Sequence, residues 1–227
     1  MNLRDRARPS DAAHLGAEGD RRSHELITAE LHRRRPHDAV RSEEAELDHA
    51  GRRGGRVWIV DPLDGTREFS EGRSDFAVHV ALVEDGVAGV GAVALPAESL
   101  VLDSAHPPPI PASTAGPLRI VVSRTRPPAE AATVAARLGA ETVPMGSAGA
   151  KIMAVLRGHA DVYLHAGGQY EWDSAAPVAV ALAAGLHASR LDGTPLVYGR
   201  RDPWLPDLLV CRPELAEQVL LSLQTAP

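Results

Sequence analysis

The sequence predicts a mixed fold, with an antiparallel sheet in the first half and alternating strands and helices in the second. Two observations predict it: apolar runs flank Asp85-Gly86 between residues 76 and 95, and five prolines crowd into residues 106–117. An Asp-Gly pair between such runs favours a hairpin, and a proline-rich stretch is typical of a loop. We therefore place a boundary there and predict two halves, residues 1–117 and 118–227, that form one unit.

The first half opens with a predicted amphipathic helix. Apolar residues recur at helical spacing between Asp20 and Arg35, and Pro36 ends the pattern. A short strand is expected over residues 38–41, and a buried strand over residues 56–60. The second of these is predicted to stop at Pro62, because proline has no N–H to donate to a ladder.

The second half has an α/β pattern, in which short apolar runs alternate with helical segments. The expected elements are a strand over 118–122, helices over 129–138 and 147–157, a strand over 161–165, an alanine-rich helix over 174–186, a strand pair around Asp192-Gly193 and a closing helix over 214–223.

Composition bounds the class of protein. A chain of 227 residues with 44% apolar and 24% charged residues can bury a core, which excludes a disordered chain or a disulfide miniprotein. The net charge of -6 argues against a nucleic-acid partner. No apolar run approaches the roughly 20 residues of a membrane span, and the lone Cys211 with a charged, signal-free start favours the cytoplasm.

The strongest chemical signal is Asp61-Pro62-Leu63-Asp64-Gly65-Thr66. Two carboxylates on one sharp turn need a cation, and carboxylates with a backbone carbonyl suit Mg²⁺. Leu63 would supply that carbonyl, and the N–H groups of Gly65 and Thr66 would face a phosphate. Alone, the hexapeptide is also compatible with a plain polar turn.

Other acidic residues join this signal. Glu43 follows the strand over 38–41, and Asp173 begins the alanine-rich helix, although each alone is compatible with a surface acid or a helix cap. Phosphatases with an aspartyl nucleophile carry Asp-x-Asp-Gly-Thr, whereas two residues separate the aspartates here. The glycine-rich stretch ending at Lys151 lacks the adjacent Gly-Lys of a nucleotide-binding P-loop, which excludes that class.

Three blocks together resemble the Mg²⁺-dependent, lithium-sensitive phosphatases of the inositol monophosphatase and fructose bisphosphatase family. They are Ser-Glu-Glu at 42–44, Trp-Ile-Val-Asp-Pro-Leu-Asp-Gly-Thr-Arg-Glu-Phe at 58–69 and Trp-Asp-Ser-Ala-Ala-Pro at 172–177, the last followed by Asp-Gly-Thr-Pro-Leu-Val-Tyr at 192–198. Gly-Ser-Ala-Gly-Ala-Lys at 146–151 and residues 165–169 resemble its 3′(2′),5′-bisphosphate nucleotidases, which act in sulfate assimilation.

The resemblance implies an αβαβα layered sandwich and a site for about two or three Mg²⁺ ions. It implies that Glu43, Asp61, the Leu63 carbonyl, Asp64 and Asp173 are the metal ligands, and that Asp20 and Thr66 activate the attacking water. The substrate residues that it implies are Gly65, Thr66, Ser123, Arg126, Ser147 and Lys151. It also implies a homodimer.

One departure from the family concerns the start of the chain. Relatives begin with a long helix and a lysine-bearing loop, whereas about nineteen residues precede Asp20 here and contain no lysine. We therefore expect the usual N-terminal helix to be missing or shortened.

The resemblance implies a phosphatase that removes the 3′-phosphate of adenosine 3′,5′-bisphosphate, giving AMP and phosphate. Inositol phosphates and fructose 1,6-bisphosphate are alternative substrates of the same chemistry. A non-catalytic binding relative is the alternative from another class, and the five clustered oxygen ligands argue against it.

Overall fold

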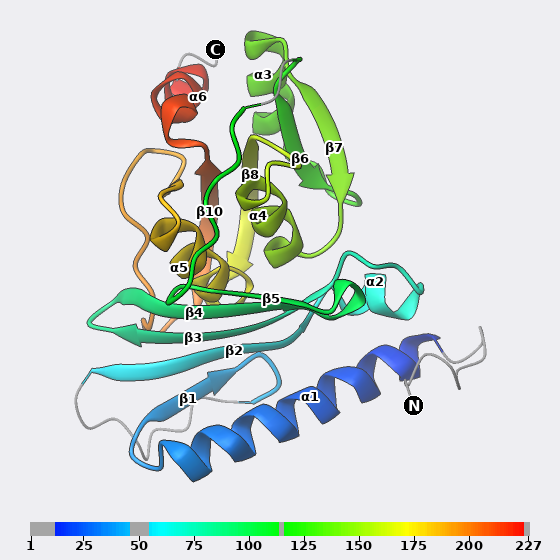
Figure 1. Ribbon diagram of the computed structural model, residues 1–227, viewed down its shortest axis with the longest axis vertical. Coiled ribbons are helices and arrows are strands. Elements are labelled where there is room, and N and C mark those ends of the chain that lie inside the picture. The colour runs from blue at the N-terminus through cyan, green and yellow to red at the C-terminus, as the bar shows by residue number, and fades with distance from the viewer. Residues whose placement is uncertain (1–11, 46–54, 114–115, 225–227) are drawn as a thin grey trace.

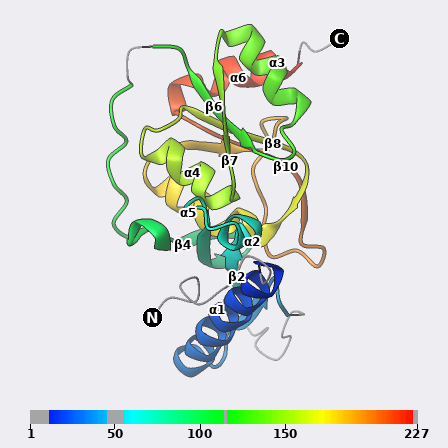
Figure 2. The same ribbon diagram turned by 90° about the vertical axis from the view of Figure 1, so that its right-hand side faces the viewer.

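The computed structural model describes residues 12–45, 55–113 and 116–224, which form two five-stranded sheets with helices around and between them (Figure 1). Helix α1 covers one face of the first sheet, α4 and α5 lie between the sheets, and α3 and α6 cover the outer face of the second (Figure 2). The predicted αβαβα sandwich is confirmed. No helix in the described ranges is long and apolar enough to cross a membrane.

The first sheet has the order β1-β2-β3-β4-β5. Its strands are β1 (Ala39–Ser42), β2 (Arg56–Asp64), β3 (Ala77–Glu84), β4 (Val87–Leu95) and β5 (Leu100–Asp103). Strand β1 is parallel to β2 and the other pairs are antiparallel, so the predicted hairpin around Asp85-Gly86 is confirmed.

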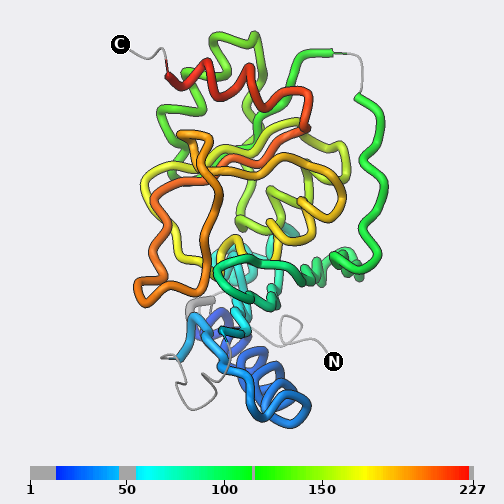
Figure 3. The backbone as a smooth tube through the Cα atoms, turned by 90° about the vertical axis from the view of Figure 1, so that its left-hand side faces the viewer, coloured from blue at the N-terminus to red at the C-terminus, as the bar shows by residue number. Residues whose placement is uncertain are grey.

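The second sheet has the order β7-β6-β8-β10-β9. Its strands are β6 (Arg119–Ser123), β7 (Glu141–Met145), β8 (Val162–Tyr170), β9 (His187–Ser189) and β10 (Trp204–Cys211). Strand β6 is parallel to β7 and β8, and β10 is antiparallel to β8 and β9. Described residues between β5 and β6 form an extended stretch along one side of the molecule, without regular structure (Figure 3).

The structure has six α-helices in its described residues, and those of the second half lie where the sequence predicts helices. They are α1 (Ala12–Arg34), α2 (Thr66–Ser70), α3 (Ala129–Leu138), α4 (Ala148–Leu156), α5 (Ala175–Ala183) and α6 (Ala216–Gln224), with 3-10 turns at Pro96–Glu98, Glu171–Asp173 and Pro213–Leu215. The predicted bounds of α3 are confirmed at both ends.

Three sequence predictions about elements are wrong. Helix α1 begins at Ala12 rather than Asp20, and β2 continues to Asp64 because its pairing with β3 shifts by one residue after Asp61, so that Pro62 need not donate to the ladder. The strand pair around Asp192-Gly193 is absent, since those residues form a tight turn and β9 pairs with β10 instead.

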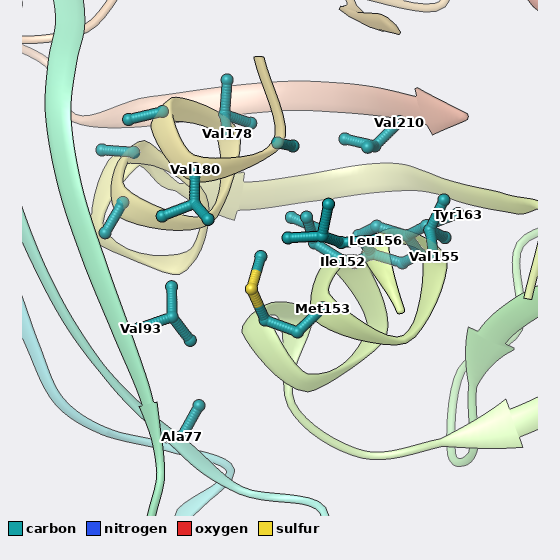
Figure 4. Packing of buried hydrophobic residues seen from close by; sticks show 14 of the residues in the cluster. Ala77, Val93, Ile152, Met153, Val155, Leu156, Tyr163, Val178, Val180 and Val210 are labelled. Carbon is teal, nitrogen blue, oxygen red and sulfur yellow. The ribbon is translucent and has the colours of Figure 1, made fainter. Parts of the chain in front are cut away.

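The main core lies between the two sheets. It is built from the inner faces of both sheets and from nearly all of α4 and α5. Met153, Ile152 and Val180 are among the buried residues of this core (Figure 4). Burying apolar side chains of this size stabilises the fold by about 1.5–3 kcal/mol each. Because the core is shared, it holds the ends of β2 and of β8 in a fixed relation, and both ends carry predicted site residues.

Candidate active site

The end of β2 carries two buried carboxylates. Asp61 is almost wholly buried, and its Oδ1 accepts a hydrogen bond from the Leu63 N–H at 3.0 Å. The Thr66 hydroxyl donates to the Leu63 carbonyl at 3.0 Å. These local bonds fix the turn between the strand and α2, so Asp61 and Asp64 face the same region.

The second carboxylate, Asp64, is held by the start of α4, which belongs to the other half of the chain. Asp64 Oδ2 accepts hydrogen bonds from the Ser147 hydroxyl at 2.5 Å and from the Gly149 N–H at 2.7 Å. Ser147 has a φ of 49°, a conformation that is uncommon for a residue other than glycine. Lys151 supports this bend, because its Nζ donates to the carbonyls of Ser147 at 2.7 Å and Gly146 at 3.3 Å.

A third carboxylate comes from the 3-10 turn after β8. Asp173 Oδ2 accepts the Tyr170 N–H at 2.7 Å, which fixes its orientation. Burial, followed by the nearby charge of Asp64, raises the pKa of Asp173 to about 7. The same effects act more strongly on Asp61, whose pKa is held well above its usual range.

A buried ion pair ties this turn to β1. Glu171, two residues before Asp173, pairs with Arg41, two residues before Glu43, and both side chains are almost fully buried. Arg41 also donates to the Arg200 carbonyl at 2.6 Å, and Glu171 accepts the Gly199 N–H at 2.7 Å. The pair thus connects segments that are 130 residues apart.

Two more predicted acids lie near this group. Glu43 is exposed at the surface, but partial burial of its carboxylate, followed by the charges of Asp20 and Asp173, raises the pKa of Glu43 to about 7. Burial and Glu44 raise the pKa of Asp20 to about 7. Helix α1 brings Asp20 in by a close approach to α2, where a Cβ on Gly16 would lie 2.5 Å from Ser70 Oγ.

His79, near the start of β3, is a site residue that was not predicted from the sequence. Its side chain is fully buried, and Nδ1 is 3.1 Å from the Trp172 carbonyl. Because a carbonyl only accepts, Nδ1 carries the proton, and burial lowers the pKa of the ring so that it stays neutral. Nε2 then presents a lone pair to Asp64 Oδ2 at 3.3 Å.

This donor set fits a metal ion. Ligand atoms of Asp61, Asp64 and His79 all lie within 4.8 Å of one another. Buried carboxylates that repel one another, beside a His79 nitrogen with no hydrogen-bond partner in the described ranges, need a positive charge between them. The oxygen-rich donors match the hard cations Mg²⁺, Ca²⁺ or Mn²⁺ better than a thiolate-seeking metal.

A cavity of 960 Å³ opens beside these acids. Of the predicted site residues it is lined by Asp64, Gly65, Thr66, Ser123, Arg126, Ser147, Lys151 and Asp173, whereas Asp20, Glu43, Asp61 and Leu63 are not part of its lining. Arg126 is exposed and makes no ion pair with any residue that the structure describes. Arg124, also in the lining, is held by Glu68 at 2.9 Å and Glu71 at 2.8 Å.

Comparison with known proteins gives a consistent relationship. Residues 7–226 match the inositol monophosphatase family. A protein of Mycobacterium tuberculosis described as "3′-phosphoadenosine 5′-phosphate phosphatase" is 53% identical over 221 residues, covering 93% of this chain and 83% of that protein. The "3′(2′),5′-bisphosphate nucleotidase CysQ" of Escherichia coli is 35% identical over 161 residues, or 66% of this chain and 65% of that protein.

A solved structure supports the same relationship. The crystal structure of CysQ from Bacteroides thetaiotaomicron superposes with a TM-score of 0.75 and is 31% identical. The superposition covers 86% of this chain and 83% of that one.

Proposed function

This chain belongs to the inositol monophosphatase family, and we propose that it is a Mg²⁺-dependent phosphatase that removes the 3′-phosphate of adenosine 3′,5′-bisphosphate. The observation that carries this proposal is the group of acids with raised pKa values beside a cavity that Arg126 also lines. The activities named for relatives at 53% and 35% identity support the choice of substrate.

The metal ligands of this proposal are Asp61, Asp64, Asp173, Glu43 and the Leu63 carbonyl, which would hold about two or three Mg²⁺ ions. When bound, Mg²⁺ lowers the pKa of a coordinated water and balances negative charge on the phosphoryl group. His79 would also offer the lone pair of its Nε2 to the cation that Asp64 holds, since Nε2 lies 3.3 Å from Asp64 Oδ2 while its other nitrogen donates to the Trp172 carbonyl.

Asp20 and Thr66 are the proposed proton-handling residues. A carboxyl with a pKa near 7 is suited to accept a proton at neutral pH, and Asp20 Oδ1 is buried without a partner among the described residues. Thr66 would orient the attacking water by accepting a hydrogen bond from it, because its own hydroxyl hydrogen is donated to the Leu63 carbonyl.

The remaining proposed residues would hold the substrate. Arg126 would pair with its second phosphate, since it lines the cavity and makes no ion pair with the residues described. Ser123 would fix the Arg126 loop, because its hydroxyl accepts the Arg126 N–H at 3.2 Å. Gly65, Ser147 and Lys151 line the part of the cavity nearest Asp64, where the reacting phosphate would lie.

The test is phosphate release from adenosine 3′,5′-bisphosphate, inositol 1-phosphate and fructose 1,6-bisphosphate, each with Mg²⁺ and with EDTA. We expect the nucleotide to be preferred and EDTA to abolish release. Asp64→Asn should lower kcat/KM by at least about 100-fold, since losing even an outer partner of a metal ligand costs about 10- to 100-fold.

Asp85→Asn is the matched control, because it makes the same chemical change on an exposed turn away from the cavity. Its activity should equal that of the wild type. Release from none of the three substrates would refute the proposal, and preference for a polyol phosphate would reassign the substrate.

A further inference from the structure

Two large aromatic side chains lie on the cavity wall without a role so far. Trp204 begins β10 and Tyr170 ends β8, and the two are paired across the strands. Trp204 is 50% exposed and Tyr170 48% exposed, and both line the cavity. Aromatic rings left exposed in a cavity are available to a flat ligand.

The position of the Trp204 ring depends on a glycine. Gly168 has a φ of 94°, and a Cβ built there would lie 2.6 Å from the indole Nε1 and 3.0 Å from Cε2 and Cζ2. The indole therefore rests directly against the β8 backbone at Gly168, which supports it from one side. Tyr170 is in turn stacked on Trp172, with ring centroids 4.7 Å apart and 14° between the planes.

The pair of Trp204 and Tyr170 is joined to the acidic group by one hydrogen bond. The Tyr170 N–H donates to Asp173 Oδ2 at 2.7 Å, and Asp173 lines the same cavity. A ligand with a phosphate beside Asp64 and Asp173 would thus extend its other end along this wall. A flat, uncharged ring system joined to a phosphorylated sugar is a nucleobase.

We propose that Trp204, supported by Gly168 and flanked by Tyr170, is the platform on which the base of the nucleotide stacks. This inference rests on the proposed function and explains how the site would select nucleotides. Stacking on an aromatic ring tolerates any base, so this wall distinguishes nucleotides from phosphate esters without a base, rather than adenine from other bases. A polyol phosphate has no π face and gains nothing from the indole.

The test compares AMP with ribose 5-phosphate, which lacks only the base, by titration calorimetry with Mg²⁺ present. Stacking is worth roughly 5- to 150-fold in affinity, so wild-type protein should bind AMP more tightly by about that factor. Trp204→Ala should remove the difference by weakening AMP alone, whereas Trp204→Phe should retain most of it. Gly168→Ala, which displaces the indole, should reduce it while Trp204 is still present.

The calorimetric measurements need no turnover, so they test this proposal independently of the phosphatase proposal. If the protein releases no phosphate but Trp204→Ala removes its preference for AMP, the platform stands and the proposed reaction fails. Wild-type protein that binds the two ligands equally, or binds neither, would overturn the platform. So would a Trp204→Ala variant that keeps the native circular dichroism spectrum and an unchanged preference.

Discussion

The two walls of the cavity are built in opposite ways. The acidic wall has Asp64 and Asp173 in the cavity lining and Asp20, Glu43 and Asp61 near them. It is fixed by buried hydrogen bonds and by the Arg41–Glu171 pair. The open wall, formed by Ser123, Arg126, Tyr170 and Trp204, carries exposed side chains with few polar partners. The acidic wall fixes the positions of the metal ligands, at the cost of burying carboxylates that repel one another. The open wall leaves aromatic rings and a positive charge available to a bound molecule.

The comparison predicts that substitutions behind the acidic wall change stability and metal affinity, whereas those in the open wall change ligand affinity alone. The largest effect is expected for Arg41→Leu. It leaves the buried Glu171 carboxylate without its cation, which should lower the free energy of unfolding by about 3–5 kcal/mol. Urea denaturation followed by circular dichroism measures this.

The double variant Arg41→Leu with Glu171→Leu is the control. It removes both charges and should recover most of the lost stability, because a buried ion pair replaced by apolar residues is often neutral. Since both residues stand two positions from a proposed metal ligand, the double variant should still bind Mn²⁺ more weakly than the wild type in a calorimetric titration. A single variant of native stability would show that the pair does not hold this wall.

A second prediction concerns pH and metal removal. The pKa values of Asp20, Glu43 and Asp173 are raised to about 7, so the folded, metal-free protein holds protons that the unfolded chain releases near pH 4. The stability that these groups contribute is therefore fully present below about pH 4 and is lost as pH rises through 7. Thermal unfolding with EDTA at pH 5 to 8 tests this.

Saturating Mg²⁺ should reverse the trend, because it replaces the missing protons as the positive charge. The rise in Tm with Mg²⁺ should be larger at pH 8 than at pH 5. Asp173→Asn should flatten the metal-free slope, since it removes one of the titrating carboxyls. Stability that rises between pH 5 and 8 without metal would contradict the repulsion described for the acidic wall.

A smaller effect is expected where α1 meets α2. In Gly16→Ala the new Cβ would lie 2.5 Å from Ser70 Oγ and 2.8 Å from Thr66 Cγ2, so the helices must separate at a cost of about 1–3 kcal/mol. Asp20, one turn further along α1, should shift as well and lower kcat. Gly89→Ala is the matched control, because nothing lies within 4 Å of a Cβ there.

Adding Ser70→Ala to Gly16→Ala removes the closest atom and should restore part of the stability. If Gly16→Ala and Gly89→Ala unfold at the same denaturant concentration, the close approach of α1 to α2 is not needed to place Asp20.

Local signals predicted much of the acidic wall and little of the open one. Asp61 to Thr66 is a continuous motif, and strand β2 with the turn after it follows from that motif and its flanking apolar run. His79 carries no such signal, because in sequence it is one polar residue in an alternating strand. Only the pairing of β2 with β3 brings it to Asp61.

The other residues missed depend on contacts between distant segments. Arg41 and Glu171 are 130 residues apart, and Trp204 meets Tyr170 only because β10 pairs with β8. Strand β10 itself was missed because Pro206 and Asp207 interrupt its apolar run. The periodicity of apolar residues in the sequence indicates which face of a helix or strand is buried, but not which other element packs against that face.

The smallest effect on stability, and the sharpest test of the open wall, is expected for Arg126→Gln. Arg126 is exposed and unpaired among the described residues, so its loss should change the free energy of unfolding by less than about 0.5 kcal/mol. A hydrogen bond to a charged group is worth about 1.5–3 kcal/mol, so the KM for adenosine 3′,5′-bisphosphate should rise at least about 10-fold with little change in kcat.

Adenosine 3′-monophosphate, which lacks the second phosphate, should show little change in KM with the same variant. Arg124→Gln provides the contrast, because it breaks contacts with Glu68 and Glu71 and should lower stability more than Arg126→Gln does. An equal rise in KM for both substrates would mean that Arg126 senses the overall charge of the ligand rather than its second phosphate. The open wall would then select by stacking alone.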